Sequence, residues 1–428
     1  MNEIKPFYGW RYNLEKVRLE DVLAPPYDVV SPEEQENYLK KSPYNVFHLE
    51  LGEILSTDNQ DENRYTRARE FWNRWRQEGI LIREEKPSIY LYLLHFEWEG
   101  KLLTRRGFIS LVRLAPWKSK KILPHEKTFD KVTEDRLKLL RATHAQFSQI
   151  FCLYHDKALT SLKVLEKEAK PLCRAKDPQG FTHELLQVND EEAIKTVQQT
   201  IAQGPLYIAD GHHRYTTALR FMKEMEEKYG ANPPRCFHYM MMYLCPFEEP
   251  GLLVLPTHRL LTLSLSLTDI EQKLKSWGQI SQIDVPTEKL AVYVNELKPH
   301  QFVFINNGKA YLFELEAEKV QKAKEVFPAP VAKLPVSLFT WVMKEALGID
   351  EAALKVQGKA RFIPWANEVI SKAKGNTFGF LLAPTPVLAL EEVSQAGTVM
   401  PHKSTYFHPK ILTGTVFFEI SPEKGPPC

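Results

Sequence analysis

The stretch PLYIADGHHRYTTALRF, residues 205–221, places a strand pattern, a turn and a helix pattern in direct succession. Residues 206–209 form an apolar run that is typical of a buried strand. Apolar side chains then recur from Tyr215 to Met222 at the spacing of one helix face, and Gly230 follows as a stop signal. The pattern predicts a strand that ends at an Asp-Gly turn and leads into an amphipathic helix.

The turn, residues 210–214, has the residue types of an anion site. The first N–H groups of a helix lack intrahelical partners, Gly211 allows close approach of the backbone, and Arg214 can bind a phosphate through two bonds. His212 or His213 can donate to phosphate or transfer a proton. Asp210 would repel phosphate unless it is protonated, binds a metal or orients a donor, and Mg²⁺ held by Asp210 is the simplest of these solutions. The alternative is an ordinary helix with Asp210 as its N-cap and Arg214 in a surface ion pair.

A second polar pattern lies upstream, in the residues Leu-Pro-His-Glu at 123–126. His125 and Glu126 form a titratable pair that could deprotonate a hydroxyl group. The alternative is an exposed His-Glu pair in a loop. Thr133 is predicted to cap the helix that follows, and residues 150–154 are predicted to form a buried strand.

Local patterns predict four further elements. Ser31 and Glu34 form a capping box for a helix over 32–39, and an aromatic stripe predicts a helix over 61–78. Two strands are expected around the Glu99-Gly100 turn within residues 87–114, and a hairpin is expected around Asn307-Gly308.

Composition excludes several classes of protein. The chain has 428 residues, enough for two or three domains, and its 43% hydrophobic and 26% charged residues are close to average usage. A net charge of +2 gives no reason to expect nucleic acid or a membrane surface as a partner. No signal sequence or membrane span is recognised, so a cytoplasmic protein is expected. Its five cysteines show no CxxC spacing, which predicts reduced thiols rather than a zinc site or disulfides.

The two polar motifs together resemble those of the ParB/sulfiredoxin-like superfamily, which includes free L-serine kinases. The resemblance implies that Glu126 acts as the base toward a serine hydroxyl. It also implies that Asp210 is the magnesium-linked acid and that Gly211, His212 and Arg214 cradle nucleotide phosphates. The spacing between the motifs is longer here than in compact members, which implies an insertion at 157–200.

Over the whole chain, the sequence resembles the family called domain of unknown function 1015. The stretches that carry this resemblance, such as APPYDVVSPEE, YIADGHHRYTTAL and MPHKSTYFHPK, extend from residue 24 to residue 410. Arg136 and Arg141 point in different directions on one helix, and Arg141 is taken as the phosphate ligand. Polar residues in these stretches are candidates for substrate binding, with a structural role as the alternative: Tyr27, Asp28, Asn45, Lys403, Ser404, Tyr406 and Lys410.

These observations predict an α+β protein with mixed α/β layers. Residues 1–250 would hold a ParB/sulfiredoxin-like nucleotide-binding core with insertions, and residues 251–428 an α+β part that closes the cleft. The expected function is phosphoryl transfer from ATP or ADP, with Mg²⁺, to a metabolite hydroxyl, and free L-serine is the first choice of acceptor. The alternative is a ParB-like nucleotide-binding regulatory protein without turnover. No Walker or kinase Gly-rich loop is present, and the sequence does not indicate the oligomeric state.

Overall fold

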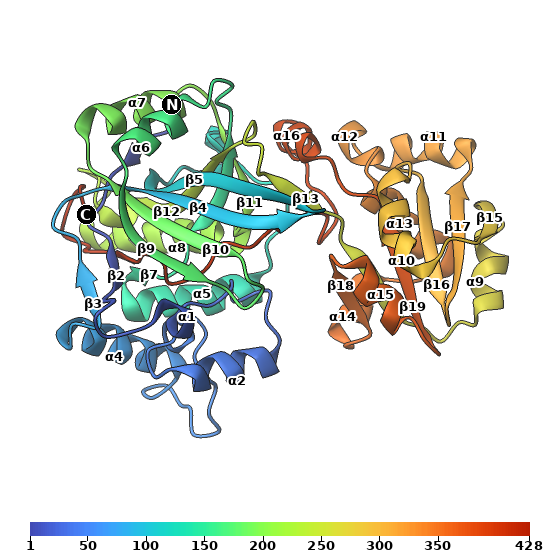
Figure 1. Ribbon diagram of the computed structural model, residues 1–428, viewed down its shortest axis with the longest axis horizontal. Helices are drawn as coiled ribbons and strands as arrows, with labels where there is room; N and C mark the ends of the chain where they lie inside the picture. Colours follow the sequence, from blue (N-terminus) through green and yellow to red (C-terminus); the bar gives the residue numbers. More distant parts are fainter. The chain divides into compact units, whose positions relative to one another are not determined.

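The computed structural model describes the backbone of residues 1–428, and the side chains of all of them except Thr287, Glu288 and Val356. The chain forms two compact units, residues 1–252 with 409–428, and residues 253–408 (Figure 1). The sequence-based division differs at the C-terminus, because segment 409–428 returns to the first unit. Its apolar residues explain this return, since Leu412 and Phe417 are buried in that unit's core.

The first unit is built on a mixed sheet of nine strands. The order is β6-β11-β8-β12-β5-β4-β10-β9, and β1 pairs with β5. The pairs β6–β11 and β8–β12 are parallel, and the other pairs are antiparallel. The strands are β1 (Ile4–Lys5), β4 (Ile89–Trp98), β5 (Lys101–Arg113), β6 (Ile122–Leu123), β8 (Ile150–Tyr154), β9 (Lys170–Lys176), β10 (Thr182–Val188), β11 (Leu206–Asp210) and β12 (Tyr239–Pro246). The predicted mixed α/β architecture is therefore confirmed.

Small strands and helices complete this unit. Figure 1 shows α2, α4 and α5 on one side of the sheet, and α6 and α7 on the other. The helices are α1 (Leu19–Val22), α2 (Pro32–Lys41), α3 (Phe47–Glu50), α4 (Arg64–Gln77), α5 (Asp130–Thr143), α6 (Thr160–Glu168), α7 (Glu191–Ile201) and α8 (His212–Tyr229), with 3-10 turns η1 (Trp117–Ser119) and η2 (Cys236–His238). Two further ladders pair β2 (Trp10–Tyr12) with β3 (Leu81–Arg83), and β7 (Ala145–Gln146) with β21 (Phe418–Glu419).

Most local predictions for this unit hold. The capping box of Ser31 and Glu34 is present at the start of α2, and the aromatic stripe of α4 faces the core through Trp72 and Trp75. The β4–β5 hairpin turns at Glu99-Gly100, where both residues have positive φ. The predicted start of α5 was wrong. The helix begins at Asp130, so Thr133 lies within its first turn, where its hydroxyl donates to the Phe129 carbonyl.

The segment 157–200 contains α6, the β9–β10 hairpin and α7. The hairpin extends the sheet, because β10 pairs with β4 along its whole length from Thr182 to Val188. That this segment is an insertion stays a prediction.

Cys236 and Cys428 form a disulfide, which corrects the expectation of reduced thiols. Their Cα atoms lie 5.8 Å apart although the residues are separated by 192 positions, so local spacing gave no sign of the pair. Cys152 and Cys245 are free and buried, and Cys173 is free and half-buried.

The second unit has an antiparallel six-stranded sheet in the order β15-β17-β16-β19-β14-β18. Both faces are covered: Phe302 and Phe304 of β16 pack into one hydrophobic cluster, and the alternating Val303 and Ile305 pack into another. The hairpin of β16 and β17 turns at Asn307-Gly308 as predicted.

The strands of this unit are β13 (Leu253–Leu255), β14 (His258–Thr262), β15 (Gly278–Ile283), β16 (Gln301–Asn306), β17 (Lys309–Leu315), β18 (Ala360–Ile363), β19 (Thr377–Leu382) and β20 (Tyr406–His408). Its helices are α9 (Leu267–Leu274), α10 (Thr287–Tyr293), η3 (Val294–Glu296), α11 (Ala317–Val326), α12 (Ala329–Ala332), α13 (Pro335–Leu347), α14 (Glu351–Val356), α15 (Ala366–Lys372) and α16 (Val387–Gln395). Across the described residues of both units, no helix has the length and apolar character needed to cross a membrane.

Candidate functional site

The two polar motifs lie side by side because they follow adjacent parallel strands. Leu206 pairs with Ile122, and Tyr207 with Leu123, so β6 and β11 run in the same direction. Their carboxyl ends therefore meet at one edge of the sheet, the position where open α/β sheets commonly bind ligands. The chain leaves β6 through His125 and Glu126 toward α5, and it leaves β11 through Asp210 directly into α8.

The turn at Gly211 needs glycine for two reasons. Its φ is +99°, in the region that side chains other than glycine rarely adopt. The guanidinium of Arg214 also folds back against it, so that a Cβ at this position would lie 3.0 Å from one of the terminal nitrogens. Glycine at position 211 thus allows the chain to turn into α8 while the Arg214 side chain packs against the turn.

Arg214 is buried, with 9% of its surface exposed. Its Nη1 donates to the Gln149 carbonyl, and its Nη2 lies 3.7 Å from Asp210 Oδ1. Nε finds no hydrogen-bond partner among the described residues. Burial opposes the charge of Arg214, and Asp210 is the largest of the effects that nevertheless raise its pKa. The side chain is therefore a buried cation with donor capacity to spare.

Asp210 is held between two cations. Lys410 Nζ donates to Asp210 Oδ2 at 2.7 Å, and Arg214 approaches the other carboxylate oxygen. Lys410 comes from segment 409–428, which belongs to the same unit. Of the three ways in which Asp210 could coexist with a phosphate, the structure displays the orienting of neighbouring donors.

The two histidines of the turn both hold the loop before α5. His212 Nε2 accepts the His125 backbone N–H at 3.2 Å, and His213 Nε2 accepts the Phe129 N–H at 3.1 Å. Since a backbone N–H can only donate, Nε2 of each imidazole carries no proton in these bonds, and both imidazoles are neutral. Consecutive residues of α8 thus fix two points, four positions apart, on the loop that carries Glu126.

His125 is fully buried beneath the motif. Its Nδ1 donates to the Ile208 carbonyl at 2.8 Å, and its ring packs edge-on against His212. Burial lowers the pKa of His125 to about 4 and lowers the pKa of His212 well below its usual range. Both rings therefore stay neutral at physiological pH.

Glu126 is the more accessible member of its motif, with 22% of its side chain exposed. The carboxylate Oε2 lies 3.8 Å from His212 Nδ1. Because His212 accepts at Nε2, its proton is on Nδ1 and faces Glu126. The arrangement gives a carboxylate at the sheet edge with a neutral imidazole beside it.

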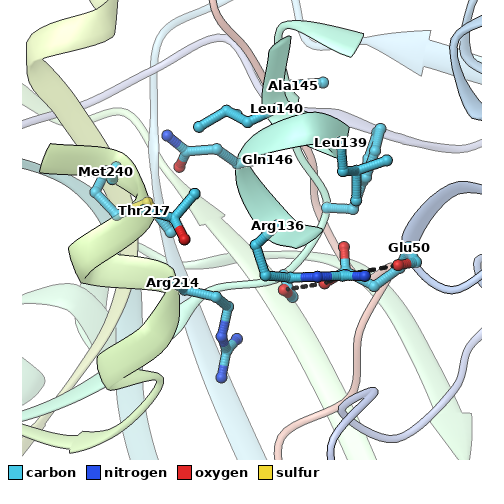
Figure 2. A pocket seen from close by; sticks show the side chains of 12 residues that line it. Glu50, Arg136, Leu139, Leu140, Ala145, Gln146, Arg214, Thr217 and Met240 are labelled. Atoms are coloured by element: carbon cyan, nitrogen blue, oxygen red, sulfur yellow. Dashed lines mark hydrogen bonds and ion pairs between the residues drawn. The ribbon is translucent and has the colours of Figure 1, made fainter. Parts of the chain in front are cut away.

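The two arginines of α5 differ from expectation. Arg141 is 44% exposed and binds Glu224 through Nε and Nη2, with Glu134 nearby. Arg136 is instead buried, and together with Arg214 it lines a cavity of about 50 Å³ between α5 and α8 (Figure 2). The helix turns its second arginine away from the site because the two lie five positions apart.

The proposed substrate residues separate into three groups. Tyr27 lies under the Arg136 guanidinium at 4.4 Å, and its neighbour Asp28 acts electrostatically on Arg214, so this loop borders the site. Asn45 is fully buried and bonds to the Asp21 carbonyl and the Phe47 N–H, which is a structural role. Lys403, Ser404 and Tyr406 belong to the second unit, whereas Lys410 belongs to the first.

Sequence reasoning missed Glu50 and Ser148, which line the same cavity. Glu50 is 5% exposed and accepts from the Ser148 hydroxyl at 3.0 Å. An acid inside the apolar run VFHLELG was the available sign, because a carboxylate among buried side chains is uncommon without a partner.

Three solved structures resemble parts of this chain. They are a mutant of a free serine kinase in complex with ADP (14% identity, TM-score 0.37, 71% of this chain and 90% of that chain covered), SbnI with a C-terminal truncation from Staphylococcus aureus (10%, 0.35, 71% and 85%) and a conserved hypothetical protein from Pyrococcus furiosus (14%, 0.32, 71% and 93%). Their TM-scores are too low for these likenesses to carry an argument.

The comparison with curated proteins gave no match. The model of one protein family, described as protein of unknown function (DUF1015), matches residues 4–337, which include both polar motifs and most of the chain. The chain therefore belongs to the DUF1015 family.

Proposed function

We propose that this protein transfers a phosphoryl group from ATP or ADP to the hydroxyl group of a small metabolite. Free L-serine is the first acceptor to test. One observation carries the proposal: the partly exposed carboxylate of Glu126 lies at the same sheet edge as Arg214, the Asp210–Lys410 pair and the start of α8.

The phosphate side of the reaction is assigned to α8, Arg214 and Lys410. The first N–H groups of an 18-residue helix point out of its start, and the helix dipole adds about 0.3–1 kcal/mol for an exposed anion. That contribution is small for a multiply charged phosphate. The two side-chain cations supply the remainder, and Asp210 orients both of them.

The hydroxyl side is assigned to Glu126. Its carboxylate takes the proton of the acceptor hydroxyl, whose oxygen forms the new bond to phosphorus. The bond between that phosphorus and the bridging oxygen breaks, and its electron pair leaves on the shortened nucleotide. His212 faces Glu126 with its Nδ1–H at 3.8 Å, and His125 packs against His212 and donates its backbone N–H to it, without taking part in proton transfer.

Magnesium fits this site as a partner of the nucleotide. Asp210 offers one carboxylate, and the described residues contain no group of three His, Cys, Asp or Glu side chains that could hold a metal ion by themselves. Mg²⁺ commonly binds through one or two carboxylates together with phosphate oxygens and water. When bound, it would neutralise charge on the transferring phosphoryl group.

A second candidate is a nucleotide-binding regulatory protein without turnover, as the resemblance to ParB-like proteins implies. The bonding of the histidines favours it, because both imidazoles of the turn are engaged with backbone N–H groups. Such a protein needs Arg214, Lys410 and the start of α8, but it does not need Glu126.

Phosphorus-31 NMR of the full chain with Mg²⁺, ATP or ADP, and L-serine tests the proposal. A new phosphomonoester resonance that requires L-serine is expected. Glu126→Gln is expected to keep nucleotide binding and to lose about 10²–10⁴-fold in turnover, because the hydroxyl loses its base. Glu134→Gln is the matched control, since Glu134 is a partly exposed carboxylate on α5 that pairs with Arg220 and Arg141 at the surface.

The outcomes separate the two candidates. Turnover by Glu126→Gln at the wild-type rate would remove Glu126 as the base. Intact nucleotide in every mixture, with resonances shifted by the protein, would replace the kinase with the regulatory protein. Replacing L-serine by a pool of other small hydroxyl compounds tests the acceptor separately from the reaction.

A further inference from the structure

The cavity beside Arg214 contains a buried carboxylate that the proposed reaction does not use. Figure 2 shows Arg136 extending from α5 to Glu50, and Arg214 extending from α8 on the other side of the cavity. Glu50 ends the short helix α3 and is 5% exposed. A buried carboxylate that is not balanced by a cation is strongly unfavourable, so its partners define its role.

Arg136 is shared between two acids. Its Nη1 lies 3.5 Å from Glu50 Oε1, and its Nη2 lies 2.6 Å from Asp135 Oδ2. Asp135 in turn binds Arg64 and the Tyr65 hydroxyl. Arg136 is therefore divided between Glu50 and Asp135, and Glu50 also acts by charge on the second arginine of the cavity, Arg214.

These interactions form a row of side chains of alternating charge through the first unit. From segment 409–428 to α4 it consists of Lys410, Asp210, Arg214, Glu50, Arg136, Asp135 and Arg64. Glu50 acts on Arg214 by charge across the cavity, without a direct hydrogen bond between the two. Arg214 is therefore the cation whose direct contacts leave a donor, Nε, open to a ligand.

We propose that Glu50 competes with a bound phosphate for Arg214 and thereby sets how tightly the site holds its anion. The proposal rests on the proposed function, because it takes Arg214 to be the phosphate ligand. In a site shielded from water, a negative charge close to Arg214 lowers the potential that an incoming anion meets. Neutralising Glu50 should therefore tighten anion binding, whereas removing a side chain that only supports the fold would loosen it.

Acidification should tighten anion binding, as a substitution that neutralises Glu50 does. Burial raises the pKa of Glu50, and the nearby Arg136 and Arg214 oppose this effect. The other charged or titratable groups that face it are Asp135 on α5, whose pKa Arg136 lowers against the effect of burial, and Tyr27 and Asp28 in the loop before α2. As the pH falls through the raised pKa of Glu50, the carboxyl becomes neutral and no longer competes with the bound anion for Arg214. Anion binding should therefore tighten.

Sulfate is the probe, because it stays a dianion over the whole range in which Glu50 titrates. Isothermal titration calorimetry should show that Glu50→Gln binds sulfate about tenfold more tightly than the wild type near neutral pH. Wild-type binding should tighten on acidification, and that dependence should be weaker in Glu50→Gln. Arg214→Ala should lose most of the sulfate binding, and ADP should give the same order of affinities at neutral pH.

Each result decides the proposal. Equal or weaker sulfate binding by a Glu50→Gln variant with wild-type circular dichroism overturns this inference and leaves the proposed function standing. Absence of both sulfate and ADP binding in the wild type overturns the anion site, and the proposed function with it. If Glu50→Gln does not fold, Ser148→Ala decides. The Ser148 hydroxyl stabilises the ionised carboxylate, so its loss should shift the tightening to higher pH, and an unshifted profile contradicts the proposal.

Discussion

Arg214 of the first unit and Arg259 of the second are both buried, and they balance their charge differently. In the second unit, Arg259 is 0% exposed, and its Nε donates to Glu351 Oε1 at 2.8 Å. The guanidinium also lies over the Phe362 ring at 4.9 Å. In the first unit, Arg214 Nη2 approaches the Asp210 carboxylate only to 3.7 Å, and a cavity lies beside it.

The difference separates an arginine that holds a fold from one that is available to a ligand. An unpaired nitrogen does not make the distinction by itself, since Nη2 of Arg259 and Nε of Arg214 both lack hydrogen-bond partners among the described residues. What differs is the direct carboxylate bond and the aromatic packing around Arg259. Those contacts leave a ligand little to gain there, whereas Arg214 still has charge and a donor to offer.

The largest expected effect is on stability, at Glu351. Replacing Glu351 with alanine leaves Arg259 buried without its carboxylate and removes the acceptor of the Thr340 hydroxyl. The second unit should lose about 3–5 kcal/mol of unfolding free energy, measured by urea denaturation. Glu345→Ala, an exposed acid on α13, is the control and should change little. A loss below about 1 kcal/mol at Glu351 would mean that the aromatic rings alone can hold Arg259.

The next effect concerns binding, at Arg214. Lysine keeps the positive charge near Asp210 but loses the planar fork, so Arg214→Lys should weaken sulfate or ADP binding by about tenfold or more. Its unfolding free energy should change much less than that of the Glu351 variant. Arg141→Lys is the matched control, because Arg141 already binds Glu224 at the surface. Equal losses of affinity in both variants would contradict the assignment of Arg214 to the ligand.

Acid should destabilise both units through buried histidines, His125 together with His212 in the first unit and His258 in the second. Burial lowers the pKa of His125 to about 4 and that of His258 to about 3, against an unfolded value near 6.5. Between these values the unfolded chain binds more protons, so stability falls as the pH falls. The loss between pH 7.5 and pH 5 should be about 2 kcal/mol for each histidine, measured by urea denaturation.

His125→Asn tests the share of the first unit, because the asparagine amide can still donate to the Ile208 carbonyl but does not titrate in this range. The variant should reduce the pH dependence of the first unit, to which His212 still contributes, and leave that of the second unit unchanged. An unchanged pH dependence in the first unit would show that other groups carry the acid sensitivity.

The elements of the site were predictable where local rules decide. The strand at 206–210, the glycine turn and the helix to Tyr229 follow from apolar periodicity and from Gly211, and the β4–β5 hairpin follows from its Glu-Gly turn. The structure adds that the two polar motifs meet, because this depends on the pairing of β6 with β11, which are separated by more than 80 residues. Local periodicity carries no information on such a pairing.

The partners of individual side chains were not predictable for the same reason. Lys410 meets Asp210 across 200 positions, and Glu50 meets Arg136 across 86, so no window of sequence contains either contact. The histidines were read as phosphate donors because imidazole suits that role. Their actual bonds go to backbone N–H groups, which every residue has and which leave no mark in the sequence.

The smallest expected effect tests the histidine contacts directly. His213→Ala removes the acceptor of the Phe129 N–H, which is worth about 1 kcal/mol, so the Phe129 amide should exchange with deuterium about fivefold faster. His213→Gln should restore part of the protection, because its amide oxygen can accept the same bond. Sulfate affinity should change little in either variant. If exchange stays at the wild-type rate while sulfate binding weakens, the His213 imidazole binds the ligand rather than the loop, as is proposed for the Arg214 guanidinium.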